Sequence, residues 1–131
     1  MSLRILYIED EPEMQELVNL IIKRKGMEFH GATSGLKGLD AVKRIQPDLI
    51  LLDIMMPELD GWSVYERLKA DPQTEQIPVL FVTARTQSDE RLREVRAANN
   101  ADDYIFKPFG PSQLLETIDR VISSHRPINN A

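Results

Sequence analysis

The chain has 131 residues, a length that suits one domain with its own hydrophobic core. It contains no cysteine, which excludes disulfides, thiolate metal sites and cysteine nucleophiles. Its 21 acidic and 16 basic residues leave a net charge of −5, the wrong sign for a general nucleic-acid-binding protein, and 42% hydrophobic residues argue against disorder.

The first predicted strand is residues 3–8, which are largely apolar and rich in strand-forming residue types. A helix should follow, because Asp10 suits the N-cap and Pro12 suits the first turn, where the missing proline N–H costs nothing. This helix is expected to run to about Lys25 and to end at Gly26.

The same alternation continues through the middle of the chain. Residues 27–31 predict a weaker strand, and Ser34 suits the cap of a helix that must end before Pro47. Residues 48–52 predict a third, apolar strand, and the pair Asp60-Gly61 predicts a turn in the loop after it.

The second half predicts a helix, a strand, a helix, a strand and a last helix, with a polar tail after them. These elements are expected at residues 62–70, 79–82, 87–98, 104–106 and from 111 to about 122, in a domain of residues 1–124 followed by a tail of residues 125–131. Five strand–helix units with short connections favour an α/β fold, with a parallel sheet covered by helices on both faces. We therefore expect right-handed crossovers and a doubly wound sheet of five strands.

Polar side chains follow four of the predicted strands at their carboxyl ends, where ligands of such sheets bind. They are Glu9, Asp10 and Glu11 after the first strand, Asp53 after the third, Thr83 after the fourth and Lys107 after the fifth. If the first and third strands are neighbours, the carboxylates converge and repel each other, and an all-oxygen site of this kind suits magnesium. A lysine and a hydroxyl beside such a metal suit a phosphoryl group, which a carboxylate can accept as an aspartyl phosphate.

Four sequence blocks, in this order and spacing, resemble a bacterial response-regulator receiver domain of the single-domain, chemotaxis-regulator type. The blocks are IEDEP at 8–12, PDLILLDIMMP at 47–57 with Asp60-Gly61, VTA at 82–84 and ADDYIFKPF at 101–109. The resemblance covers residues 3–123, nearly the whole chain, and it implies a flavodoxin-like sheet of five strands in the order 2-1-3-4-5. It implies that Asp53 accepts a phosphoryl group from the phosphohistidine of a histidine kinase or phosphotransfer protein, as a signalling phosphoacceptor rather than an enzyme.

The resemblance also implies a magnesium site, which manganese could occupy as well. Its ligands would be the carboxylates of Asp10 and Asp53 and the backbone carbonyl of Met55, with Glu9 acting on the metal through water. We expect no separate organic cofactor.

By the same resemblance, Thr83 and Lys107 would bind the phosphoryl oxygens, and the Lys107–Pro108 bond is expected to be cis. Tyr104 occupies the switch position of the family, and it would follow Thr83 inward after phosphorylation. This change would alter the face formed by the fourth helix, the fifth strand and the fifth helix, where an unknown downstream protein would bind. An ordinary strand aromatic is the competing interpretation of Tyr104.

Several expectations about partners come from composition. No apolar run approaches the ~18–20 residues of a membrane span and no signal segment opens the chain, so we expect a cytoplasmic protein without membrane contact. The acidic balance argues against direct nucleic-acid binding. The arginines of the fourth helix form either a solvated face or a docking surface. We expect a monomer or a phosphorylation-dependent dimer.

The sequence departs from the family pattern at two tolerated positions, and two further positions bear on the lifetime of the phosphoryl group. Glu9 stands where the family often has aspartate, and Asn100 replaces a common glycine before the fifth strand. Met55 and Arg85, two residues after Asp53 and Thr83, flank the expected path of an attacking water. Met55 carries no group that could orient this water, which predicts a long-lived phosphoryl group.

Other functions fit the sequence less well. A flavin-binding protein of similar topology needs a hydroxyl-rich phosphate loop where this chain has Glu-Asp-Glu-Pro, and the P-loop motif is absent. An aspartate-nucleophile phosphatase needs an aspartate at position 55. A phosphorylation-independent adaptor, and a receiver excised from a hybrid kinase or multidomain regulator, stay open.

Overall fold

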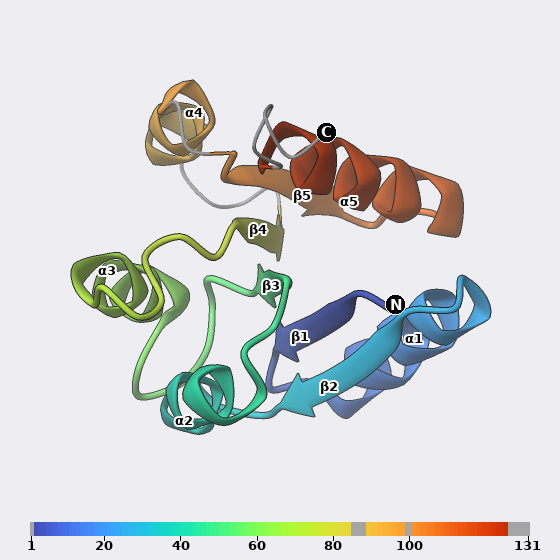
Figure 1. The fold of residues 1–131 in the computed structure, drawn as a ribbon, viewed down its shortest axis with the longest axis horizontal. Helices are drawn as coiled ribbons and strands as arrows, with labels where there is room; N and C mark the ends of the chain where they lie inside the picture. Colours follow the sequence, from blue (N-terminus) through green and yellow to red (C-terminus); the bar gives the residue numbers. More distant parts are fainter. Residues whose placement is uncertain (1, 85–88, 99–100, 126–131) are drawn as a thin grey trace.

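The computed structural model describes residues 2–84, 89–98 and 101–125, and their strands form one parallel sheet of five in the order β2-β1-β3-β4-β5 (Figure 1). The strands are β1 Arg4–Ile8, β2 Glu28–Ala32, β3 Leu49–Leu52, β4 Val79–Ala84 and β5 Asp103–Lys107. The helices are α1 Pro12–Arg24, α2 Gly35–Ile45, α3 Gly61–Ala70, α4 Asp89–Ala97 and α5 Pro111–His125. The α/β class, the doubly wound topology and the strand order predicted from the sequence are confirmed.

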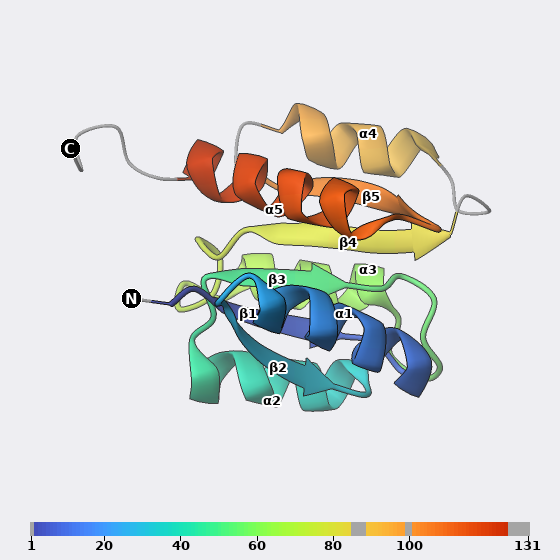
Figure 2. The ribbon, with the colours of Figure 1, turned by 90° about the vertical axis from the view of Figure 1, so that its right-hand side faces the viewer.

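Helices cover both faces of the sheet, with α1 and α5 on one face and α2, α3 and α4 on the other (Figures 1 and 2). Within β3, Leu49–Leu52, alternate side chains enter the two cores, as the two-residue period of a strand requires. Trp62 packs against the core between the sheet and helices α2, α3 and α4, with its ring centroid 4.7 Å from that of Phe81.

The register of the sheet brings the carboxyl ends of β1 and β3 to the same level. Ile8 pairs with Leu52, and the backbone N–H of Asp53 donates to the carbonyl of Ile8 at 3.1 Å. The N–H of Glu9 donates to the carbonyl of Ala32 at 3.0 Å, which holds the start of the next loop against β2. Residues that follow these two strands therefore leave the sheet side by side.

Two helix starts differ from the prediction. The N-cap of α1 is Glu11 rather than Asp10, because proline occupies the first helical position and fixes the start one residue later. The pair Asp60-Gly61 is not a turn: Asp60 caps α3 by accepting a hydrogen bond from the N–H of Ser63 at 2.9 Å. Gly61 opens α3 so close to the preceding loop that a Cβ would collide with the carbonyl oxygen of Asp53.

Strand and helix ends extend beyond several predicted boundaries. β4 continues through Thr83 to Ala84, β5 includes Lys107, and α5 continues to His125, one residue into the expected tail. Ser34 caps α2 as predicted, accepting from the N–H of Lys37 at 3.1 Å. Arg85, Asn100, residue 87 at the predicted start of the fourth helix and residues 126–131 of the predicted tail lie outside the described residues. Among the helices of the described chain, none combines the length and the apolar character that a membrane crossing needs.

Candidate functional site

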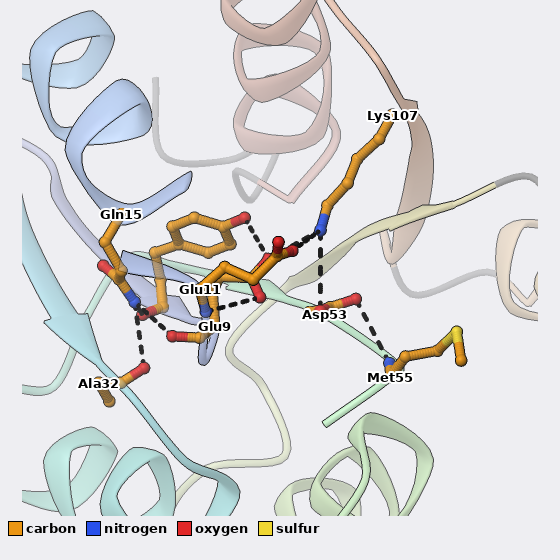
Figure 3. A network of polar contacts seen from close by, with 8 residues as sticks. Glu9, Glu11, Gln15, Ala32, Asp53, Met55 and Lys107 are labelled. Atoms are coloured by element: carbon orange, nitrogen blue, oxygen red, sulfur yellow. Dashed lines mark hydrogen bonds and ion pairs between the residues drawn. The ribbon is translucent and has the colours of Figure 1, made fainter. Parts of the chain in front are cut away.

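Three carboxylates converge at the carboxyl ends of β1 and β3, as the sequence predicted. Glu9 is fully buried, Asp53 is 4% exposed and Asp10 is half-buried. One carboxylate oxygen from each of the three lies within 4.8 Å of the others. Figure 3 shows Glu9 and Asp53 beside each other, with Met55 below them.

Lys107 reaches this cluster from the end of β5 and contacts Glu9 most closely. Its Nζ donates to Glu9 Oε1 at 2.8 Å, whereas Asp53 Oδ2 lies at 3.7 Å and Glu11 Oε1 at 3.5 Å (Figure 3). The Lys107–Pro108 peptide bond is cis, as expected. The lysine is thus hydrogen-bonded to Glu9 and only near Asp53.

Burial and neighbouring charges shift the pKa values of the three carboxylates in different directions. Burial, together with the charge of Glu9, raises the pKa of Asp53 to about 7, against the opposing effects of Lys107 and the N–H of Met55. Burial also raises the pKa of Asp10, with Glu9 adding to the shift. Burial alone would raise the pKa of Glu9, but the hydrogen bond from Lys107 and its charge hold that pKa below the usual value. The cluster therefore holds one firmly ionised carboxylate and one that is hard to ionise.

The remaining predicted residues stand around the cluster. Thr83 is fully buried, and its Oγ1 has no hydrogen-bond partner in the described part of the chain. Tyr104 is half-buried, with its ring centroid 5.2 Å from that of Phe106 and 4.0 Å from the guanidinium carbon of Arg96. A buried hydroxyl without a partner is costly, so Thr83 Oγ1 is suited to donate to a bound ligand oxygen.

The donor set fits a hard divalent cation. All three clustered groups are carboxylates, and burial together with the charge of Glu9 disfavours a negative charge on Asp53, which a bound cation would offset. Asp10 is only half-buried, so solvent can reach the cluster from the side of Asp10. Met55 is 59% exposed. The N–H of Met55 donates to Asp53 Oδ1 at 3.3 Å, which keeps this loop against the carboxylate.

Two residues that were not predicted from the sequence, Tyr7 and Gln15, hold Glu9 and its backbone. Tyr7 is fully buried, and its hydroxyl donates to Glu9 Oε1 at 2.9 Å; burial and the charge of Glu9 raise the pKa of Tyr7. Gln15 Nε2 donates to the carbonyls of Tyr7, Glu9 and Ala32 at 3.1, 3.0 and 3.1 Å (Figure 3). A tyrosine in an otherwise apolar strand was the available signal, because a buried hydroxyl usually has a partner.

Asp102, in the last of the four sequence blocks, has a structural role. It is 2% exposed and accepts hydrogen bonds from the hydroxyl of Tyr65 at 2.6 Å and the N–H of Val79 at 2.8 Å. Lys69 Nζ pairs with the same carboxylate at 3.1 Å. Asp102 therefore joins the start of β5 to α3 and to the start of β4. These contacts lie at the amino ends of the strands, whereas the carboxylate cluster lies at their carboxyl ends.

Two arginines of α4 have partners within the domain. Arg91 lies over the ring of Trp62, 4.2 Å from its centroid, and pairs with Glu66 at 3.0 Å. Arg96 pairs with Asp103 at 2.6 Å. These contacts fasten α4 to α3 and β5, so the basic side of α4 is neither fully solvated nor fully available for docking.

Comparison with known proteins agrees with this geometry. The chain matches the response regulator receiver domain family over residues 5–119. It is 38% identical over 115 residues to the DNA-binding dual master transcriptional regulator RpaA of Synechocystis sp., covering 88% of this chain and 47% of that protein. The chain spans about half the length of the curated relatives it matches.

Solved structures show the same fold. The N-terminal domain of a response regulator receiver protein from Methanoculleus marisnigri JR1 is 39% identical, with a TM-score of 0.75 and coverage of 92% of this chain and 97% of that one. The receiver domain of the sensor histidine kinase PA1611 from Pseudomonas aeruginosa PAO1 is 27% identical, with a TM-score of 0.80 and coverage of 94% and 99%. That structure holds a magnesium ion in its active-site cleft.

Proposed function

Because this chain belongs to the response regulator receiver domain family of two-component signalling, we propose that Asp53 is its phosphoacceptor in a magnesium-dependent transfer. The observation that carries this proposal is the environment of Asp53. It is a buried carboxylate beside two others, and at the same end of the sheet lie a lysine ammonium and a threonine hydroxyl that has no partner within residues 2–84, 89–98 and 101–125. A general acidic patch would not bring these groups together.

In the proposed reaction, an Asp53 carboxylate oxygen forms a bond to phosphorus while the phosphorus–nitrogen bond of a partner's phosphohistidine breaks. The electron pair of that bond returns to the departing imidazole. Lys107 pairs with the phosphoryl oxygens, and Thr83 donates its hydroxyl hydrogen to one of them. Bound Mg²⁺ (or Mn²⁺), held by Asp10, Asp53 and the Met55 carbonyl with Glu9 acting through water, would neutralise the negative charge brought together in this step.

The proposed output is a shift in the face formed by α4, β5 and α5. Thr83 would move toward the phosphoryl group, and Tyr104, whose ring now lies beside Arg96, would follow it inward. In this proposal phosphorylation shifts the population between two existing conformations, so the difference in phosphoryl contacts between them limits how far the population shifts. This face is hollowed by a cavity of about 350 Å³ lined in part by Arg96, Tyr104 and Arg120, which supports its use by a downstream protein.

The curated relatives that the chain matches are longer proteins. The chain covers 47% of RpaA and 55% of the Escherichia coli phosphate regulon regulator PhoB, so in each of these proteins the receiver is accompanied by further sequence. We propose that this chain, too, acts on an output unit, in the same protein or in another chain. A cytoplasmic location and a monomer or phosphorylation-dependent dimer stay predictions.

The proposal is tested by incubating the protein with Mg²⁺ and acetyl phosphate and measuring the intact mass. We expect one added phosphoryl group on the wild-type protein, and none on Asp53→Ala or after chelation of the metal. Asp40→Asn is the matched control, because its side chain is 80% exposed on α2 and should leave labelling unchanged. No adduct on the wild type, or an adduct that persists in Asp53→Ala, contradicts the proposal.

Met55→Asn should shorten the lifetime of the phosphoryl group about three- to tenfold, a change of roughly 1 kcal/mol in the barrier to hydrolysis. The wild-type side chain is 59% exposed and cannot orient water, whereas an amide can hydrogen-bond a water near Asp53. The measurement is a dephosphorylation time course after removal of the donor. Leu36→Asn, at another apolar side chain that is 59% exposed, should not change the lifetime. Loss of phosphate at the wild-type rate in Met55→Asn would contradict the prediction.

A further inference from the structure

Glu9 Oε1 accepts hydrogen bonds from two side chains, one on β1 and one on β5. The hydroxyl of Tyr7 donates to it at 2.9 Å, and Lys107 Nζ donates to it at 2.8 Å. The other carboxylate oxygen accepts from the N–H of Glu11 at 3.3 Å. Glu9 and Tyr7 are both fully buried, so water does not replace a lost partner easily.

Lys107 has to change partners when a phosphoryl group is present. Its Nζ is 2.8 Å from Glu9 but 3.7 Å from Asp53, too far for a hydrogen bond to the acceptor carboxylate. As Lys107 turns toward phosphoryl oxygens on Asp53, its contact with Glu9 weakens. A buried carboxylate that loses its cation is strongly destabilised unless another donor stays in place.

Tyr7 is the donor that stays. Its ring is packed in the core between the sheet and helices α1 and α5, among side chains such as Ile22 and Ile118. The hydroxyl is therefore held toward Glu9 independently of the position of Lys107. A phenylalanine would fill the same core volume, so the packing of β1 does not require the hydroxyl.

We infer that Tyr7 is a positioning residue for phosphoryl transfer: its hydroxyl holds Glu9 and so releases Lys107 toward the phosphoryl oxygens on Asp53. The inference rests on the proposed function of Asp53. Without the hydroxyl, Glu9 depends more heavily on Lys107, and the lysine is less available to the phosphoryl group. Tyr7 itself does not touch the reacting atoms.

The first experiment compares the rate of phosphorylation by acetyl phosphate and Mg²⁺ in the wild type, Tyr7→Phe and Tyr65→Phe. Tyr7→Phe should react about tenfold more slowly, the size expected for losing a hydrogen bond to a charged group. Tyr65→Phe is the matched control: it removes a hydroxyl that donates to another buried carboxylate, Asp102, away from the site. Its rate should stay within about twofold of the wild type. An unchanged rate in Tyr7→Phe overturns the inference.

A double-mutant cycle with Glu9→Gln separates positioning from packing. In the Glu9→Gln background the charge shared by Tyr7 and Lys107 is gone, so adding Tyr7→Phe should slow the reaction less than about twofold. If Tyr7→Phe slows both backgrounds equally, the ring acts through packing and the inference is wrong. Failure of the wild type to become phosphorylated would instead overturn the proposed function.

An equilibrium measurement gives a second readout of the same step. Beryllium fluoride mimics a phosphoryl group on an aspartate, and its affinity can be followed by fluorine NMR in the presence of Mg²⁺. We expect about tenfold weaker binding to Tyr7→Phe than to the wild type, and unchanged binding to Tyr65→Phe. Equal affinities for all three proteins would contradict the inference even if the rates differ.

Discussion

An Asp53→Asn variant is expected to be more stable than the wild-type protein by about 1–3 kcal/mol near pH 8 without divalent cations. Asp53 is 4% exposed, and burial together with the charge of Glu9 raises its pKa to about 7. At pH 8 the wild type therefore holds an ionised carboxylate in a site that opposes the charge. Asparagine has the same shape and no charge, so it removes this cost.

The raised pKa of Asp53 also determines how the stability difference between wild type and Asp53→Asn changes with pH. In the unfolded chain Asp53 has the ordinary pKa of 3.8, so between about pH 4 and 7 the unfolded state releases a proton that the folded state retains. The free energy of unfolding of the wild type should therefore fall, relative to the variant, as the pH rises through this window. Above about pH 7 Asp53 is ionised in both the folded and the unfolded state, so the difference in free energy of unfolding between wild type and variant no longer changes with pH.

Urea denaturation, followed by the fluorescence of the single tryptophan, measures this difference at several pH values. Mg²⁺ should stabilise the wild type more than Asp53→Asn, because the proposed magnesium site includes the Asp53 carboxylate and exists only in the folded state. Asp40→Asn serves again as the control, since this exposed side chain should give no pH-dependent difference. A gap between wild type and Asp53→Asn that is the same at pH 4 and pH 8 would refute the assignment of the cost to Asp53.

Asp102→Ala should lower the free energy of unfolding by about 2–4 kcal/mol. The change removes a buried acceptor from the N–H of Val79 and the hydroxyl of Tyr65, at 2.8 and 2.6 Å, and from the ammonium of Lys69. Chemical denaturation measures the loss. Because Asp102 lies away from the carboxylate cluster, the folded variant should still accept a phosphoryl group.

Glu66→Ala is the matched control for this prediction. The Glu66 carboxylate pairs with Arg91, and the two side chains are 66% and 47% exposed, so water can replace the lost contact. Its loss should cost at most about 1 kcal/mol. Equal costs for the two substitutions would show that the buried contacts of Asp102 contribute no more than the exposed pair of Glu66.

Much of the fold follows from local patterns along the chain. Apolar segments such as residues 48–52 alternate with amphipathic segments, and this alternation with short connections predicts a parallel sheet covered on both faces. The place of Asp53, directly after a buried strand, predicts that it lies at the ligand-binding end of that sheet. The error at Asp10 arose because two local signals competed, and the proline at position 12 determined the helix start.

The sequence by itself therefore determined the class of fold, the group of residues that follow the strand ends and, through the family resemblance of its motifs, the strand order. Only the tertiary structure decided that Lys107 is hydrogen-bonded to Glu9, that the Tyr7 hydroxyl shares that carboxylate and that Thr83 Oγ1 is buried with no partner among the residues that the structure describes. The contact of Lys107 with Glu9 joins residues 98 positions apart in the chain. Such contacts depend on strand register, side-chain conformation and the exclusion of water, which the packed sheet and helices impose together and no local pattern encodes.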